Sequence, residues 1–213
     1  MAGYSHLLKK RLLKHDLEID SVNALEEEAK EAETLVDRFL HFARPFDFTA
    51  ERTNVIELIA DVVETFRVRP ENAHIEFEVR SSTAENQWAD VDRLLLKQAL
   101  VNLIENSINA YEGLPGAVDV LCTIESGFLT ITVTDKGCGI SAEDLDKIFT
   151  PFFSSRPSGT GLGLPLARKI IDLHQGRLMV DSKPKCGTAF TVILPQVQPE
   201  IKPSGRKTAT ARR

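Results

Sequence analysis

Two clusters of glycines, separated by a short aromatic segment, dominate the second half of this chain of 213 residues. The clusters are Asp135-Lys136-Gly137-Cys138-Gly139-Ile140 and Gly159-Thr160-Gly161-Leu162-Gly163-Leu164, with Phe149-Thr150-Pro151-Phe152-Phe153 between them. Glycine adopts backbone angles that other residues avoid and lets a ligand approach the main chain closely. Amides at the start of a helix also attract anions. We interpret this stretch as a mobile lid over a nucleotide.

The glycines alone do not define such a site, because a glycine-rich loop between two elements has the same composition. Gly159, Gly161 and Gly163 do not have the G-x-G-x-x-G spacing of dinucleotide-binding loops, and the chain contains no G-x-x-x-x-G-K-[ST] phosphate loop. The interpretation therefore depends on the polar residues that accompany the glycines.

Length and composition limit the alternatives. A chain of 213 residues can form one ordinary domain with an appendage, or two small domains. Its net charge of −5 gives no support for nucleic-acid binding. Cys122, Cys138 and Cys186 are scattered, so neither zinc nor a disulfide framework is indicated, and a reducing cytoplasm fits best. No apolar run approaches the length of a membrane span, although the chain could still be the cytoplasmic portion of a membrane-anchored parent.

The first 45 residues are predicted to form two amphipathic helices. Leucines and basic residues alternate over residues 5–15, and apolar residues recur at a three-four spacing over 21–43, before Pro45 ends the second helix. Two helices with a short connection form an antiparallel hairpin whose apolar stripe needs a cover. Pairing with a second copy, which gives a homodimer, would provide that cover. Packing against the chain's own domain is the alternative.

The remaining chain is predicted to form a layer of helices on a mixed sheet, and thus an α+β fold. Helices are expected from Thr53 or Asn54 to Phe66, over 91–111 with Asp90 as the capping residue, from Ser141 to Ile148 and from Gly161 to His174. Strands are expected at 74–80, 117–125, 128–135, 177–182 and 188–194. We therefore divide the chain into a helical hairpin (1–45), one α/β domain (46–196) and a basic tail (197–213) that is predicted to be disordered.

Four polar residues share one face of the predicted helix over 91–111. Asn102, Glu105, Asn106 and Asn109 are three or four residues apart, so they form a polar stripe in an otherwise apolar helix. Asparagine is a mediocre helix former, and solvated faces usually carry Lys and Glu instead. An amide oxygen suits Mg²⁺, an ion that keeps several waters and is shared with substrate phosphates. A merely solvated face is the alternative.

Asp135 continues the apolar face of the predicted strand 128–135, after Leu129, Ile131 and Val133. A carboxylate in that position must find a hydrogen-bond donor or lose solvation energy. The amino group of an adenine is such a donor. Alternatively, Asp135 merely begins the turn that follows the strand.

Five segments resemble, in order and spacing, the sequence boxes of the sensor histidine kinases. They are Asn102–Ser107 (N box), Asp135–Ile140 (G1 box), Phe149–Phe153 (F box), Gly159–Leu164 (G2 box) and Gly187–Phe190 (the final glycine-threonine motif). The resemblance covers about residues 87–195 and implies the Bergerat ATP-binding fold, a two-layer α/β sandwich shared with gyrase, Hsp90 and MutL. The segments 3–8 and 39–45 are similar to parts of the family's two dimerisation helices.

The resemblance also implies roles for the residues of these boxes. Asp135 would hydrogen-bond adenine, Asn106 would help to hold Mg²⁺, and Arg156 would reach the γ-phosphate of ATP. Asn102, near the phosphates, and Glu105 would complete the catalytic residues. The other residues expected to bind the nucleotide are Asn109, Gly137, Gly139, Ile140, Phe149, Thr160, Gly161, Leu162, Gly163, Leu164 and Thr188, with the amides around Gly161 and Gly163 cradling the phosphates.

The implied activity is transfer of the γ-phosphoryl group of Mg-ATP to a histidine, for relay to an aspartate in the receiver domain of a response regulator. The family's acceptor motif, His-Glu/Asp-x-x-x-Pro, is absent, and His15-Asp16 imitates it without the proline. We therefore expect the acceptor to have been removed or to lie on another chain, so that this chain binds ATP without labelling itself. The other histidines are expected to be structural: His6, His41, His74 and His174.

Three other functions share the implied fold. An ATPase of the gyrase or MutL kind would carry a glutamate base at the position of Asn102, whereas this chain has its glutamate at Glu105. A serine-kinase anti-sigma factor would lack the helical hairpin. A nucleotide-binding scaffold without transfer activity is the remaining alternative.

Overall fold

The chain is described by a computed structural model that covers residues 46–82, 88–156 and 159–196, together with isolated positions between 23 and 43. Its internal contacts divide it into two units, Met1–Phe46 and Asp47–Arg213. In the first unit the described positions between 23 and 43 are all helical, in agreement with the helix predicted over 21–43. The helix predicted over 5–15, and with it the complete hairpin, lies outside the described residues.

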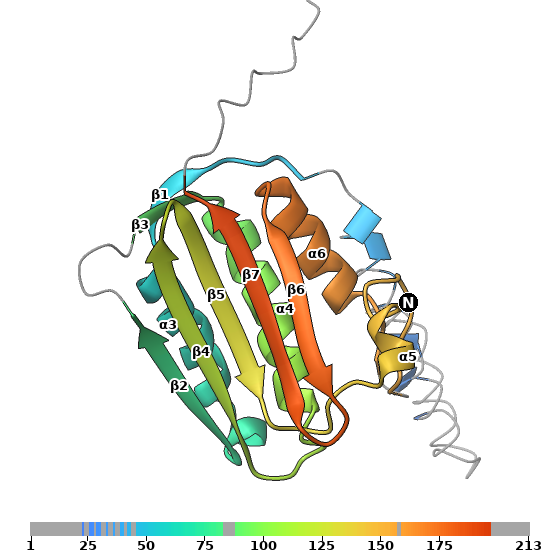
Figure 1. Cartoon of the computed structure of the whole chain (residues 1–213). Helices are drawn as coiled ribbons and strands as arrows, with labels where there is room; N and C mark the ends of the chain where they lie inside the picture. The colour runs from blue at the N-terminus through green and yellow to red at the C-terminus, as the bar shows by residue number, and fades with distance from the viewer. Residues whose placement is uncertain are drawn as a thin grey trace, which may run out of the picture. The chain divides into compact units, whose positions relative to one another are not determined.

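The second unit is built on a five-stranded mixed sheet with the strand order β2-β4-β5-β7-β6 (Figure 1). Only β2 and β4 are parallel, whereas every other neighbouring pair is antiparallel. The strands are β2 (Ile75–Ser81), β4 (Gly116–Glu125), β5 (Phe128–Asp135), β6 (Arg177–Lys183) and β7 (Gly187–Pro195). A separate antiparallel pair joins β1 (Glu51–Asn54) to β3 (Trp88–Val91).

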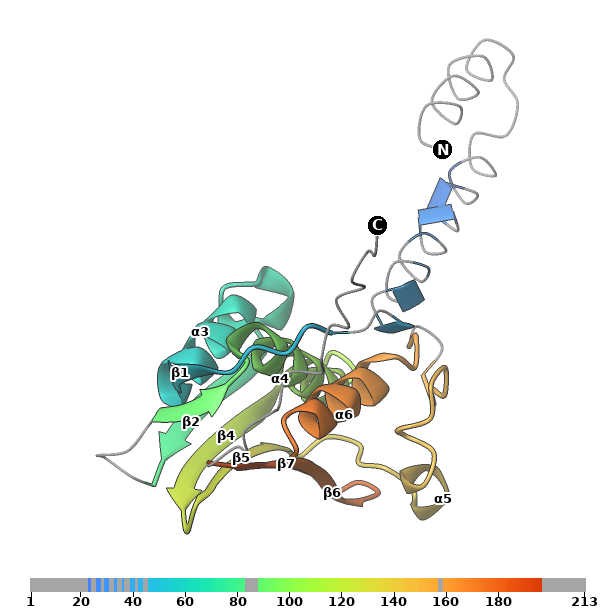
Figure 2. The ribbon, with the colours of Figure 1, turned by 90° about the horizontal axis from the view of Figure 1, so that it is seen from above.

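Three helices cover one face of this sheet, as Figure 2 shows from above. They are α3 (Val55–Arg67), α4 (Arg93–Asn109) and α6 (Gly163–Leu173), and the short elements are η1 (Pro70–Asn72) and α5 (Ala142–Leu145). The predicted two-layer sandwich of helices on a mixed sheet is therefore confirmed. Among the described residues, no helix combines the length and the apolar character needed to span a membrane.

The core lies between the two layers and follows from the alternation of side chains along the strands. In β5, Leu129, Ile131 and Val133 are fully buried, while the threonines between them are only half-buried on the other face. The helices contribute fully buried aliphatic residues from one side each: Ile59 and Val62 of α3, Leu100 and Leu103 of α4, and Ile170 and Ile171 of α6. Asp135 ends the buried face of β5.

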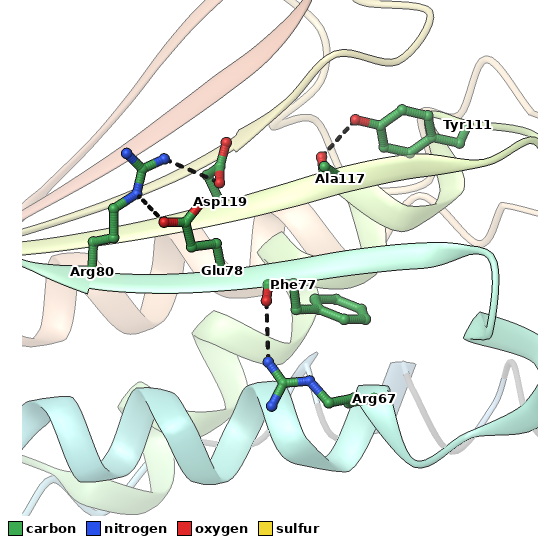
Figure 3. A network of polar contacts seen from close by, with 7 residues as sticks. All are labelled: Arg67, Phe77, Glu78, Arg80, Tyr111, Ala117 and Asp119. Atoms are coloured by element: carbon green, nitrogen blue, oxygen red, sulfur yellow. Dashed lines mark hydrogen bonds and ion pairs between the residues drawn. The ribbon is translucent and has the colours of Figure 1, made fainter.

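The outer edge of the sheet is protected by charged side chains (Figure 3). Arg67 of α3 donates a hydrogen bond of 3.1 Å to the carbonyl oxygen of Phe77 in the edge strand β2. On the same strand, Arg80 forms ion pairs with Glu78 at 3.1 Å and with Asp119 of β4 at 3.2 Å. Charged residues along an edge strand discourage pairing with the strand of another molecule.

Several predicted element boundaries were wrong: α6 begins at Gly163 rather than at Gly161, α5 ends at Leu145 rather than at residue 148, and both ends of α4 differ. Asp92, not Asp90, caps α4, because the Asp92 carboxylate accepts the N–H groups of Leu95 at 3.0 Å and Thr49 at 2.9 Å. Asp90 instead lies in β3, whose pairing with β1 was not predicted. At its other end α4 stops at Asn109 rather than at residue 111.

His174, at the carboxyl end of α6, is fully buried and hydrogen-bonded through both ring nitrogens. Nδ1 lies 2.8 Å from the carbonyl oxygen of Ile170, and Nε2 accepts the N–H of Asp92 at 3.1 Å. The ring also meets Phe48 edge to face, with the ring centroids 4.8 Å apart. This arrangement joins α6 to the start of α4 and confirms that His174 is structural.

Acid should destabilise the domain through His174. Burial lowers the pKa of this imidazole, and its contacts with Ile170 and Asp92 only partly offset that effect. Because the unfolded chain takes up the proton at about pH 6.5 while the folded domain resists it, stability is lost as the pH falls below that value. We expect the free energy of unfolding to fall by about 1 kcal/mol between pH 7.5 and 5.5. Urea unfolding followed by circular dichroism measures it, and His174→Gln should remove most of the change; an equal change in that variant would contradict the assignment.

Candidate nucleotide-binding site

Four elements meet at the end of the domain where α4 stops. The N–H of Cys138, just after β5, donates to the carbonyl of Ala110 at 2.9 Å, so the loop that follows β5 lies against the end of α4. Asp135 of β5 pairs with Thr188 of β7 in the sheet. On the other side of α4, a Cβ at Gly163 of α6 would come 3.2 Å from Asn102 Oδ1 and 3.8 Å from Asn106 Nδ2. The residues predicted to bind adenine and those predicted to bind the phosphates therefore lie on the last turns of α4 and on the elements next to them.

Asp135 is the most deeply buried acid of this cluster, with 3% of its surface exposed. One carboxylate oxygen accepts the N–H of Gly137 at 2.9 Å. Burial raises the pKa of Asp135, and the N–H groups of Gly137 and Thr188, the hydroxyl of Ser107 and the charge of Arg156 lower it. Desolvation is the largest of these effects, so these donors only partly offset the burial of the carboxylate, and a ligand that donates a further hydrogen bond suits it.

Ser107 adds an unusual polar group beside this carboxylate. Its side chain is fully buried, and its Oγ has no hydrogen-bond partner of good geometry among the described residues, although the hydroxyl favours ionisation of Asp135. A buried polar atom without a partner normally costs free energy. A polar ligand bound next to Ser107 would supply the missing hydrogen-bond partner.

The asparagines of α4 use their nitrogen atoms within the helix. Asn106 Nδ2 donates to the carbonyl of Asn102 at 2.8 Å, and Asn102 Nδ2 donates to the carbonyl of Gln98 at 3.0 Å. These two bonds do not involve the amide oxygens, and Asn102 Oδ1 is the nearest atom to a Cβ placed at Gly163. Both side chains are half-buried, as is Glu105, whereas Asn109 is exposed.

The side chains of this region fit a Mg²⁺ ion shared with a substrate better than an ion held by protein ligands alone. Among the residues described by the structure, no three His, Cys, Asp or Glu side chains converge in a way that could hold a metal. An amide oxygen such as Asn106 Oδ1 suits an ion that keeps waters and takes its remaining ligands from phosphates.

The loop after β5 is fixed by contacts with the β6–β7 turn. Ser182 Oγ accepts the N–H of Ile140 at 2.9 Å, donates to the Gly187 carbonyl and lies 2.9 Å from Thr188 Oγ1. Gly139 has a φ of +68°, and a Cβ there would collide with the carbonyl oxygen of Lys183. The two glycine-containing turns are thus packed against each other, and only glycine fits between them.

In the segment between the glycine clusters, two aromatic rings each lie beneath a cationic side chain. The guanidinium of Arg168 in α6 lies 5.1 Å from the ring centre of Phe149, and Lys147 Nζ lies 5.9 Å from that of Phe153. The N–H of Phe152 donates to the carbonyl of Gly161 at 3.0 Å, and Gly161 has a φ of +66°. The segment is therefore attached to the start of α6.

The remaining predicted residues divide between the site and the core. Leu162 is 2% exposed and belongs to the core, so only its main chain can face a ligand. Thr160, Gly163 and Leu164 are half-buried around the first turn of α6. Arg156 is half-buried and acts electrostatically on Asp135.

Tyr111 is a residue of this region that sequence reasoning missed. Its hydroxyl donates to the carbonyl of Ala117 at 2.6 Å and accepts the N–H of Lys136 at 2.8 Å, so it joins the end of α4 to β4 and to the loop after β5. Its ring lies where a side chain at Gly116 would be. The sequence signal that could have identified Tyr111 is an aromatic residue just after the helix and before a glycine-rich turn. Sequence reasoning also missed Ser107 and Ser182.

Replacing Tyr111 by phenylalanine should destabilise the domain by about 1–2 kcal/mol, because the Lys136 N–H and the Ala117 carbonyl lose their common partner. Chemical unfolding followed by circular dichroism gives the value. Tyr4→Phe, which alters the only other tyrosine, is the matched control. A loss below about 0.3 kcal/mol would show that water replaces the hydroxyl without cost.

A buried carboxylate at a strand end, an amide stripe on the adjoining helix and a glycine-rich helix start define a Bergerat-type ATP-binding domain. Residues 91–198, just over half of the 213, match the family described as histidine kinase-, DNA gyrase B-, and HSP90-like ATPase. The chain belongs to this family. The resemblance to sensor histidine kinases is confirmed by its relatives.

Two curated relatives illustrate the similarity. The signal transduction histidine-protein kinase AtoS of Escherichia coli is 32% identical over 193 residues, which cover 90% of this chain and 29% of AtoS. The sensor histidine kinase ZraS of Salmonella typhimurium is 35% identical over 175 residues, which cover 79% of this chain and 37% of ZraS. The chain therefore spans roughly a third of the length of these relatives.

Solved structures of histidine kinases have the same fold. The nucleotide-free catalytic domain of the histidine kinase ThkA matches with a TM-score of 0.63 and 31% identity, over 71% of this chain and 97% of that domain. ThkA in complex with the response regulator protein TrrA matches with a TM-score of 0.71 and 27% identity, over 92% of this chain and 56% of ThkA.

Proposed function

We propose that residues 46–196 bind Mg-ATP and transfer its γ-phosphoryl group to a histidine, as the catalytic domain of a sensor histidine kinase. The observation that carries the proposal is Asp135, a carboxylate buried at the end of β5 beside the asparagine-bearing end of α4, whose desolvation its hydrogen bonds only partly offset. Family membership supports ATP as the substrate.

Asp135 would recognise the adenine base of ATP. An ionised carboxylate accepts hydrogen bonds and donates none, so it selects the amino group of adenine and disfavours the carbonyl of guanine. Ser107 and Thr188 would share this recognition; their contribution to the environment of the Asp135 carboxylate supports this role. Gly137, Gly139 and Ile140 would shape the loop that borders the base, and Asn109 and Phe149 would complete the surroundings of the nucleotide.

The phosphates would lie at the amino end of α6. The amides around Gly161 and Gly163, with Thr160, Leu162 and Leu164 beside them, would donate to phosphate oxygens at a helix start. Asn106 would hold Mg²⁺, with Asn102 near the phosphates and Glu105 among the catalytic residues. When bound with ATP, this ion neutralises part of the triphosphate charge.

Transfer itself would depend on positioning and charge rather than on covalent chemistry by the protein. Arg156 would reach the γ-phosphate, where its guanidinium would stabilise the transferring group. The segment between the glycine clusters would act as the lid that excludes water and then admits the acceptor histidine. His174 is excluded as that acceptor because it is buried and fully hydrogen-bonded.

The proposed partners follow from this assignment. The phosphoryl group would pass on to an aspartate of a response-regulator receiver domain; the complex of the related ThkA with a response regulator supports this step. The helices before residue 46 would mediate homodimerisation. The domain would act in the cytoplasm, with membrane anchoring left to a parent protein.

The test supplies an acceptor in trans. The chain is incubated with Mg²⁺, ATP labelled in the γ-phosphate and a separately produced sensor-kinase dimerisation domain that carries the family's His-Glu/Asp-x-x-x-Pro motif, with the histidine of that motif replaced by alanine as the control. An acid-labile, base-stable label on the intact acceptor only is expected. Steady release of phosphate without label would favour the ATPase alternative, and binding without either would favour a scaffold. Label on this chain that is lost on His15→Ala would place the acceptor at His15.

A further inference from the structure

Two exposed cysteines lie on the two turns that border the candidate site. Cys138 follows Asp135 by three residues, and Cys186 precedes Thr188 by two. Both are free thiols at the surface, whereas Cys122 is buried in β4. Neither exposed cysteine has a role in the proposed function.

The main chains at the two cysteines are in direct contact. The carbonyl of Cys138 accepts the N–H of Lys185 at 2.7 Å, and Lys185 directly precedes Cys186. Next to Cys138, a Cβ at Gly139 would lie 3.2 Å from the Cα of Pro184. Cys186 directly follows Lys185, so the two turns touch within one residue of both cysteines, and a bridge between the thiols requires these exposed turns to shift further toward each other.

We propose that Cys138 and Cys186 are a paired modification site that forms a reversible disulfide when the chain meets a peroxide. Such transient disulfides are the kind found in reducing compartments. Among the described residues, no third His, Cys, Asp or Glu joins the two thiols, so a shared metal is not an alternative there.

The chemistry balances with hydrogen peroxide as the oxidant. The thiolate of one cysteine attacks a peroxide oxygen, the O–O bond breaks, and a sulfenic acid and one water form. The sulfur of the second cysteine then attacks the sulfenic sulfur, the S–O bond breaks, and a second water leaves. Two thiols have lost two electrons in total, and one peroxide has been reduced to two waters.

The bridge would act on the site through the turns it joins. The N–H of Gly137, next to Cys138, supports Asp135 at 2.9 Å, and Gly187, next to Cys186, lies against the main chain of Asp135. Drawing the two turns together would displace these supports of the carboxylate. We therefore expect oxidation to weaken nucleotide binding, a consequence that rests on the proposed function, whereas formation of the bridge does not.

Formation of the bridge is tested by mass spectrometry of the whole chain after treatment with hydrogen peroxide and alkylation of the remaining thiols. A peptide pair linked through Cys138 and Cys186 is expected, with Cys122 alkylated only after unfolding, because burial raises its pKa to about 11. Cys186→Ser, an exposed substitution, should give no intramolecular link. A link between chains, a link to Cys122 or no link in the unaltered chain would overturn the proposal.

The consequence is tested by titrating a fluorescent ATP analogue into the reduced, oxidised and re-reduced chain. Oxidation is expected to raise Kd roughly tenfold, dithiothreitol to restore it, and Cys186→Ser to remove the sensitivity. Unchanged Kd in a chain shown to be bridged would overturn the regulatory role. Absence of binding by the reduced chain would instead contradict the proposed function, so the two failures are distinguishable.

Discussion

Replacing Asp135 by asparagine is expected to weaken ATP binding by about 100-fold without destabilising the domain. The substitution keeps an oxygen that can accept the Gly137 N–H, but it removes the charge that would hold the adenine amino group. It also relieves a buried charge, since burial raises the pKa of Asp135 in the folded domain. The folded state with an ionised Asp135 is therefore penalised at neutral pH, and the penalty is relieved as the pH falls through the raised pKa.

Two measurements on this variant separate recognition from folding. Isothermal titration gives the ATP affinity, and thermal unfolding without nucleotide gives the stability, which should be unchanged or higher than that of the unaltered chain. GTP, with a carbonyl in place of the amino group, should bind the unaltered chain at least about 100-fold more weakly than ATP. Equal affinities for ATP and GTP, or an unaltered ATP affinity in Asp135→Asn, would remove Asp135 from the site.

Replacing Asn106 by alanine is the second large effect that we expect. The variant loses the amide oxygen proposed to hold Mg²⁺, and the helical bond from Asn106 Nδ2 to the Asn102 carbonyl is lost with it. The gain in ATP affinity on adding Mg²⁺ should fall about tenfold, and phosphoryl transfer to the supplied acceptor should fall at least about 100-fold. Affinity measured without Mg²⁺ should change little.

The matched control for Asn106→Ala is Gln98→Ala, which removes an amide from the same face of α4, two turns further from its end. It should leave both the Mg²⁺ effect and transfer within about threefold of the unaltered chain. If the two variants behaved alike, the loss would reflect a general disturbance of α4. If Asn106→Ala kept its Mg²⁺ response, another residue would hold the ion.

Alternating apolar residues made the strands of the five-stranded sheet predictable. Apolar residues at a three-four spacing did the same for the three long helices. Asn54 and Ser141 also act as N-caps, as expected from residues with short polar side chains before apolar runs. The strands β1 and β3 were not predicted because each has only four residues and is defined by its partner. The same pairing places Asp90 in a strand and leaves the cap to Asp92, which local sequence could not decide.

The motif residues of the candidate site could be predicted from the sequence, but the residues that hold them in place could not. Asn102, Asn106, Asp135 and Gly163 come from segments whose residue types and spacing were informative. The supports are long-range contacts between side chains and main chain: Tyr111 binds a residue 25 positions away, and Ser182 binds one 42 positions away. Nothing in the local sequence of either residue specifies such a partner, so only the folded structure reveals it.

The account is tested most directly by a crystal structure of this chain with Mg²⁺ and a non-hydrolysable ATP analogue. It predicts the adenine amino group within hydrogen-bonding distance of the Asp135 carboxylate, Mg²⁺ on Asn106 Oδ1, and the phosphates at the main chain of Gly161 and Gly163. A nucleotide bound elsewhere, or one whose base leaves Asp135 without a contact while its phosphates avoid α6, would contradict it.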